Sequence, residues 1–190
     1  MTRQLCAGIA LAWAPLSGVV LAQLPTAPVD QLETALAAQP SATKALGQWC
    51  AAHQLASPAT ITATQVKGRD ALPPADLRHL LGIEQYEALG YRHVLLDCAT
   101  TTLSEAHNWY VPARLTPEMN TTLADSDTPF GTVVAPLHFT REPLASIKGR
   151  AVSCPAGTVL SHRALLRLPD GKPLALVVEC YTSANFASPR

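Results

Sequence analysis

Long apolar runs of strand length follow one another closely in the C-terminal half of the chain, and they restrict its fold more than any other feature. The runs over residues 91–99 and 102–112 are separated by only a few residues, which suits a hairpin. The runs over 158–168 and 173–182 flank Asp170-Gly171, a dipeptide that favours a hairpin turn. Because hairpins join antiparallel strands, the sequence predicts an antiparallel sheet.

Helical patterns come mainly before these strands. Apolar residues at helical spacing predict helices over 29–38 and 41–53, with Ser41 as the N-cap of the second helix. A short helical turn is expected at 77–81 and a further helix over 115–124.

Two more segments, 60–67 and 137–147, have the pattern of strands, and Thr128-Pro129-Phe130-Gly131 predicts a tight turn. Helices followed by an antiparallel sheet define the α+β class, in contrast to the alternating units of a parallel sheet. A chain of 190 residues fits one such domain.

The first 22 residues have the features of a secretory signal peptide. Arg3 is followed by an uncharged run over 5–22, and Val20-Leu21-Ala22 places small residues where a signal peptidase cleaves. We therefore expect a signal peptide at 1–22, a linker at 23–28 and the domain at 29–190. The alternative is an apolar first helix of the domain, against which Pro15 argues because it interrupts the run. Cleavage implies a periplasmic or secreted protein, and an uncleaved segment implies a cytoplasmic one.

Four cysteines remain after such a cleavage, namely Cys50, Cys98, Cys154 and Cys180. An even set in a chain bound for an oxidising compartment suits two disulfides, whose three possible connectivities the sequence leaves open. Four buried free thiols are the alternative. The absence of a C-x-x-C pair argues against a zinc site built on cysteine.

Charge and hydropathy limit the class of partner. The chain has 14 basic and 14 acidic residues, whereas a nucleic-acid-binding protein shows a basic excess. After the N-terminal segment, no apolar run is long enough to span a membrane. The sequence has no glycine-rich phosphate loop. We expect a monomer that binds a small molecule.

Two charged residues stand inside apolar strands. Arg92 neighbours the run Val94-Leu95-Leu96, and Glu179 follows Leu176-Val177-Val178. A charge in such a run must be solvated, paired or functional, because burial of a lone charge costs several kcal/mol. Alternation could point each residue to solvent, or Arg92 and Glu179 could pair with each other.

Two weaker patterns concern catalysis and metal binding. Ser41 and Lys44 match the S-x-x-K of serine acyl-enzymes, but the chain lacks the other motifs of that class, and a helix cap explains Ser41 better. Glu105 and His107 stand two apart, on one face of a strand, and could bind a metal. Without a third ligand in view, a surface pair is the simpler interpretation.

Several strings, taken in order, resemble the bacterial chorismate pyruvate-lyase family. They are Ser41-Ala42-Thr43-Lys44, Tyr91-Arg92-His93-Val94-Leu95-Leu96, Val111-Pro112, Thr128-Pro129-Phe130-Gly131, and Leu166-Arg167-Leu168 with Gly171-Lys172-Pro173-Leu174 and Glu179. Their order and spacing agree over residues 29–186. The resemblance implies a six-stranded antiparallel sheet with helices packed on it. It also implies a lyase that releases pyruvate from chorismate and leaves 4-hydroxybenzoate, with no metal or organic cofactor.

The resemblance also assigns site residues. Arg92 would anchor the ring carboxylate, and Glu179 would orient the ring hydroxyl and assist proton removal, so both are the expected catalytic residues. Backbone amides at Ala42 and Phe130 would complete substrate binding. The family carries a larger apolar residue at the first of these positions and a leucine at the second, so the pocket is expected to differ in shape.

An exported lyase would be separated from its substrate. Chorismate is made in the cytoplasm, and quinone synthesis uses 4-hydroxybenzoate there. The alternative function is therefore a non-catalytic, exported binding protein for an aromatic carboxylic acid on the same fold.

Overall fold

A computed structural model describes residues 27–68 and 71–187 of the chain. The predicted signal peptide lies outside these residues. The predicted linker also lies outside them, apart from its last two residues, of which Pro28 already begins the first helix.

Six strands form one sheet in which every neighbouring pair is antiparallel, as the sequence predicted. The strands are β1 Ile61–Gln65, β2 Gly90–Cys98, β3 Thr101–Tyr110, β4 Thr140–Lys148, β5 Thr158–Arg167 and β6 Pro173–Thr182. Their order across the sheet is β1-β2-β3-β6-β5-β4. The β2–β3 and β5–β6 hairpins therefore lie side by side through β3 and β6, and the α+β prediction is confirmed.

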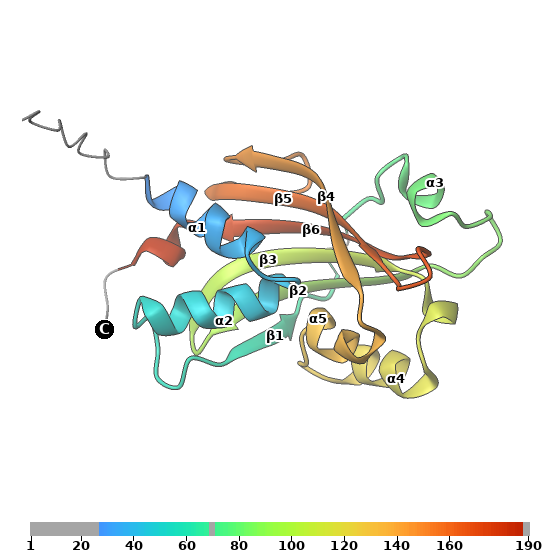
Figure 1. Ribbon diagram of the computed structural model, residues 1–190, viewed down its shortest axis with the longest axis horizontal. Coiled ribbons are helices and arrows are strands. Elements are labelled where there is room, and N and C mark those ends of the chain that lie inside the picture. Colours follow the sequence, from blue (N-terminus) through green and yellow to red (C-terminus); the bar gives the residue numbers. More distant parts are fainter. Residues whose placement is uncertain (1–26, 69–70, 188–190) are drawn as a thin grey trace, which may run out of the picture.

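The helices differ little from the predicted ones. They are α1 Pro28–Ala37, α2 Ala42–Ala52, α3 Leu77–Leu81, α4 Pro117–Asp125 and α5 Phe130–Val133, with short 3-10 turns at Pro112–Arg114, Ala135–Leu137 and Ser183–Phe186. The hydroxyl of Ser41 accepts a hydrogen bond from the backbone N–H of Lys44, which confirms Ser41 as an N-cap. In Figure 1, α1 and α2 lie along one side of the sheet, whereas α3 lies beyond one end of the strands.

The predicted tight turn at Thr128-Pro129-Phe130-Gly131 is wrong. The Pro129 carbonyl accepts hydrogen bonds from the N–H groups of Thr132 and Val133, and the Phe130 carbonyl accepts one from Val134. The backbone therefore turns into the short helix α5, for which Pro129 is the N-cap. Proline suits this position because it has no N–H that the first helical turn would leave unpaired.

Alternation along the strands divides the core between two faces of the sheet. The face that carries Val94, Ala106 and Val177, here called face A, packs against α1, α2, α4 and α5. The opposite face, here called face B, carries Trp109 and Val178 and packs against α3 and the loop 149–157. Both faces are therefore covered over the central strands, whereas Thr62 and Thr64 of the edge strand β1 and most of the edge strand β4 are exposed.

Two disulfides use the four cysteines of the described part of the chain. Cys50 pairs with Cys98, which ties α2 to β2 on face A, and Cys154 pairs with Cys180, which ties the loop 149–157 to β6 on face B. They select one of the three connectivities that the sequence left open. Each restricts the unfolded chain and contributes about 2–4 kcal/mol to stability.

Among the helices of residues 27–68 and 71–187, none is both long and apolar enough to cross a membrane.

Gly90 provides a test of this packing because the Tyr110 ring lies directly against its backbone. A methyl group at Gly90 would lie 2.4–2.8 Å from three ring atoms, and the ring also packs against Phe130, with ring centroids 5.4 Å apart. We expect Gly90→Ala to lower the free energy of unfolding by about 1–3 kcal/mol, measured by urea denaturation.

Gly47→Ala is the matched control, since the added methyl would meet only ordinary contacts at 3.8 Å and beyond. A glycine inside helix α2 gains helix propensity on this change, so stability should rise by about 0.5–1 kcal/mol. Equal effects of the two substitutions would contradict the close packing of Tyr110 on Gly90.

Candidate functional site

A small cavity opens on face A between the sheet, the start of α2 and the start of α5. Its volume is about 30 Å³, which is room for one or two water molecules. Most of its wall is apolar, and three side chains supply the polar groups of the interior. These are Arg141 from β4, Glu179 from β6 and Asn108 from β3, and the hydroxyl residues Ser41 and Thr43 line the cavity at the start of α2.

A buried ion pair forms the polar centre of this cavity. The two terminal nitrogens of Arg141 donate to the two carboxylate oxygens of Glu179, with Nη1–Oε1 at 3.1 Å and Nη2–Oε2 at 2.5 Å. The Tyr181 hydroxyl donates to Oε2 at 2.9 Å. The side chain of Arg141 is 14% exposed and that of Glu179 is 7% exposed. Arg141 therefore reaches over β5 and neutralises a carboxylate that would otherwise be isolated in the core.

The electrostatics of the pair follow from its burial. Desolvation lowers the pKa of Arg141, but the charge and hydrogen bonds of Glu179 outweigh it and hold the pKa above its ordinary value. Burial and the neighbouring carboxylate raise the pKa of the Tyr181 phenol well above its usual range. Arg141 is thus a cation and Tyr181 a neutral donor at every physiological pH.

A wider hollow adjoins the cavity and shares Pro40, Phe139 and Arg141 with it. Its volume is about 480 Å³, within the range of pockets that hold small organic ligands. Arg141 lines both spaces and therefore lies on the wall that they share. His162 and Arg163 of β5 supply further polar groups, and desolvation lowers the pKa of His162 and favours its neutral form.

The start of α2 contributes a second electropositive feature. Ala42 and Thr43 line the cavity at the first turn of an 11-residue helix. The unpaired N–H groups and the dipole at such an end favour an anion. A methyl group added at Gly131 would lie 3.3 Å from the Ser41 hydroxyl oxygen, so α5 approaches this end closely.

Three of the four residues predicted from the sequence line this cavity. Glu179, Ala42 and Phe130 contribute to its wall, and all three are buried. Ala42 and Phe130 come from separate helices, so their meeting here agrees with the predicted pocket.

The fourth predicted residue, Arg92, is buried beside the cavity but does not line it. Its Nη1 donates to the Thr128 carbonyl at 2.6 Å and its Nη2 to the Ser126 carbonyl at 2.5 Å. Desolvation lowers its pKa. Arg92 thus holds the segment before α5. Its side chain is neither exposed to solvent nor paired with Glu179, which were the two alternatives that the sequence left open.

Sequence reasoning missed Arg141, the residue that pairs with Glu179. A carboxylate in an apolar strand needs a cation near it, so Glu179 itself could have indicated that a basic residue lies close to it in the fold. Arg141 and Glu179 are 38 positions apart, so no local pattern connects them.

The predicted surface pair of Glu105 and His107 is also wrong. His107 is 3% exposed, and His93 of β2 lies directly opposite it in the sheet. Desolvation, reinforced by the nearby His93, lowers the pKa of His107 to about 4, so this imidazole is neutral at pH 7. These side chains lie on face B, away from the cavity.

Comparison with known proteins gives a relative at 40% identity. The uncharacterised protein y4mC of Sinorhizobium fredii is 40% identical over 197 residues, and the match spans 92% of this chain and 81% of that protein. No family model matches the sequence.

Solved structures share the fold at much lower identity. The effector domain of PhnF from Mycobacterium smegmatis superimposes with a TM-score of 0.53 at 12% identity, covering 76% of this chain and 89% of that domain. A second PhnF structure extends beyond this domain and gives the same TM-score and identity. The match covers 77% of this chain and 65% of that one, so this chain spans only part of it. The predicted chorismate-lyase-like fold is thereby confirmed, and the effector domain of PhnF shares it.

The ion pair gives a thermodynamic prediction. Glu179→Met should lower the free energy of unfolding by about 3–5 kcal/mol, because it leaves the buried Arg141 charge unpaired. The double variant Arg141→Met with Glu179→Met should recover part of that loss, since no charge is left unpaired, although the buried Tyr181 hydroxyl still loses its acceptor. Urea denaturation of the single and double variants measures both changes. Additive losses in the double variant would contradict a coupled pair.

Proposed function

The chain belongs to the family of the uncharacterised protein y4mC of Sinorhizobium fredii, and we propose that it binds a small aromatic carboxylic acid at Arg141 without catalysing a reaction. The observation that carries this proposal is the position of Arg141 on the wall between the inner cavity and the outer hollow.

The guanidinium of Arg141 suits a carboxylate ligand. It has five N–H donors in a planar fork, of which two are directed at Glu179. A guanidinium can therefore remain paired with Glu179 and also bind a ligand carboxylate. Such charge-assisted hydrogen bonds are stronger than neutral ones and select a planar anion. The first turn of α2, which lines the same cavity, adds to the attraction.

Size and lining decide where the rest of the ligand lies. The inner cavity, at about 30 Å³, is too small for an aromatic ring, whereas the outer hollow, at about 480 Å³, is large enough. Leu36, Pro40 and Phe139 give the hollow apolar walls. The ring would pack there, with its carboxylate directed at Arg141.

Two features favour binding over the lyase reaction that the sequence resemblance implied. Both oxygens of Glu179 already accept hydrogen bonds from Arg141, whereas the predicted role requires this carboxylate to meet the ring hydroxyl. Arg92, the predicted carboxylate anchor, donates to backbone carbonyls and lies outside the cavity wall. The effector domain of PhnF shares the fold, which is compatible with a ligand-binding role.

Calorimetric titration with 4-hydroxybenzoate tests this proposal. We expect saturable one-to-one binding to the unsubstituted chain. Because each charged hydrogen bond contributes about 1.5–3 kcal/mol, Arg141→Lys should lower the affinity at least about tenfold. The double variant Arg141→Met with Glu179→Met should not bind the ligand. Arg167→Met is the control, since Arg167 pairs with Glu142 on the same part of the sheet but lines neither space.

Incubation with chorismate separates binding from catalysis. Equimolar release of pyruvate and 4-hydroxybenzoate by the purified chain would overturn the non-catalytic proposal in favour of the lyase. Binding that persists in the double variant would overturn the role of Arg141.

We further propose that the protein acts in an oxidising compartment after cleavage before Gln23. The support is the pairing of Cys50 with Cys98 and of Cys154 with Cys180, because such disulfides persist mainly outside the cytoplasm. Mass spectrometry of the native protein under non-reducing conditions should give a chain that begins at Gln23 and resists alkylation at these cysteines. An intact Met1 with alkylated thiols would contradict export.

A further inference from the structure

We propose that His93, Glu105 and His107 on face B bind one divalent transition-metal ion, with zinc as the ion that their donor set suits best. This site is independent of the carboxylate site on face A, because the two lie on opposite sides of the sheet.

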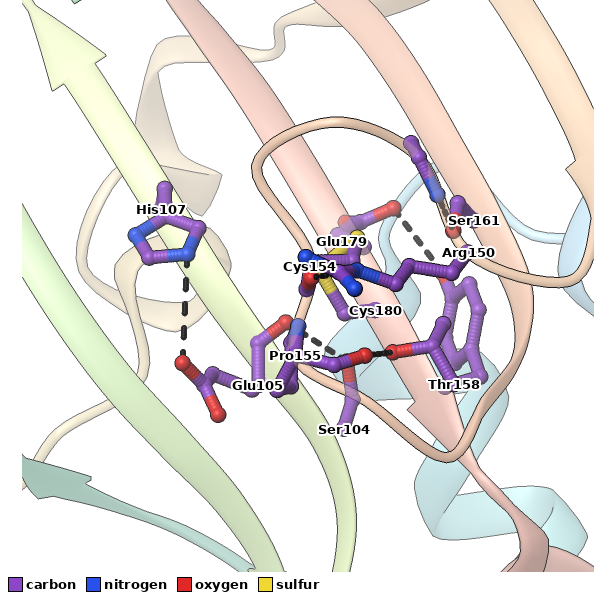
Figure 2. Close-up of a disulfide and its surroundings, with 12 residues drawn as sticks. Ser104, Glu105, His107, Arg150, Cys154, Pro155, Thr158, Ser161, Glu179 and Cys180 are labelled. Carbon is purple, nitrogen blue, oxygen red and sulfur yellow. Dashed lines mark hydrogen bonds and ion pairs between the residues drawn. A yellow bond between two sulfur atoms is a disulfide. The ribbon is translucent and has the colours of Figure 1, made fainter. Parts of the chain in front are cut away.

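The sheet brings the three side chains together from two neighbouring strands. His93 of β2 and His107 of β3 are directly paired across the hairpin, and Glu105 lies two residues before His107 on the same face. One ligand atom from each residue lies within 4.8 Å of the other two. The Nε2 atom of His93 is 2.7 Å from Oε1 of Glu105, and that of His107 is 3.9 Å from the same oxygen. Figure 2 shows the Glu105 carboxylate directed toward the His107 ring beside the disulfide.

These separations suit a metal after small side-chain rotations. Nitrogen and oxygen ligands lie about 2.0–2.2 Å from zinc, so the ligand atoms of a tetrahedral site are about 3.3–3.5 Å apart. The 2.7 Å contact would lengthen and the 3.9 Å contact would shorten by less than an ångström each. The third separation, between the ligand nitrogens of His93 and His107, is within 4.8 Å.

The Nε2 atom of His107 is the second observation that points to a ligand. His107 is 3% exposed, and this nitrogen is buried and makes no hydrogen bond of ordinary geometry within the described part of the chain, although the backbone of Ser153 lies close to the ring. A buried polar atom without a partner is costly. An ion between Nε2 and the Glu105 carboxylate would satisfy both groups.

The surroundings of His107 fix the ring as a metal ligand requires. Its other nitrogen, Nδ1, lies 2.9 Å from the Tyr91 hydroxyl. If Nδ1 donates its hydrogen to Tyr91, Nε2 carries the lone pair that coordination uses. Trp109 stacks near the ring at a centroid distance of 5.9 Å and restricts its rotation. Tyr91 is thus a positioning residue.

The site is enclosed but retains an opening. The loop 149–157 is tied by the Cys154–Cys180 disulfide to the position directly opposite Glu105. Only Glu105 is appreciably exposed, at 23% of its side chain. Two imidazoles and one carboxylate leave a coordination position for water or a ligand, as in zinc sites that are not purely structural. Imidazole also accepts iron, nickel and copper, so the proposal concerns this group of ions.

Zinc titration of the untagged, chelator-treated full chain tests the site. We expect one Zn²⁺ per chain by calorimetry, and a weakening of at least about tenfold in each of His93→Gln, Glu105→Gln and His107→Gln. Tyr91→Phe should weaken binding by about tenfold, as the loss of a group that orients a ligand does. His79→Gln is the control, because His79 is an exposed histidine on α3. Circular dichroism of each variant establishes that it is folded.

A measurement on the unsubstituted chain makes the test independent of variant folding. Long-range ¹H–¹⁵N spectra should show Zn²⁺ shifting the Nε2 resonances of His93 and His107 and leaving those of His79 unchanged. The absence of stoichiometric binding, or binding that survives His107→Gln, would overturn the proposal and leave the cluster as a hydrogen-bonded part of the core.

Discussion

The ion pair of Arg141 and Glu179 is the interaction on which the covered face A depends. Glu179 lies at the middle of the apolar strand β6, where an unpaired carboxylate would cost several kcal/mol. The bidentate contact from Arg141 and the hydroxyl of Tyr181 satisfy it. The same contact ties the edge strand β4 to β6 across β5, and Arg141 lines both the inner cavity and the outer hollow.

Helices and a loop cover the central strands on both faces of the sheet, and each face holds a polar cluster of its own. On face A, one guanidinium and the first turn of α2 provide an electropositive wall in an apolar space. On face B, two imidazoles and a carboxylate meet under the loop 149–157. Strand β3 supplies residues to both, because alternation directs Asn108 to the first face and His107 to the second. The β-sheet thus lies between the proposed carboxylate site and the proposed metal site.

The sequence predicted the elements well because their signals are local. The Ser41 cap, the two hairpins and the helix at 77–81 each depend on residues close together in the chain. Glu179 stood out as a charge inside an apolar strand, and the family resemblance gave it a role and added Ala42 and Phe130. The predicted turn at 128–131 was wrong because proline favours a turn and the start of a helix alike.

What the sequence could not predict depends on register and on long-range contact. His93 faces His107 only because the β2–β3 ladder has a register shift between Leu96 and Asp97. Without that shift, His93 would lie opposite Ala106, on the other face of the sheet from Glu105 and His107. Arg141 was missed for a related reason, since its partner lies two strands away in the sheet. The disulfide pairing likewise required the folded chain.

The central claim is that Arg141 binds the carboxylate of a small aromatic acid, and a crystal structure of the full chain with 4-hydroxybenzoate tests it most directly. The account predicts the ligand carboxylate within hydrogen-bond distance of the Arg141 guanidinium, with the ring against Phe139 in the outer hollow and Glu179 still paired. A ligand whose carboxylate lies on Arg92 instead, with its hydroxyl on Glu179, would contradict the account and support the lyase geometry.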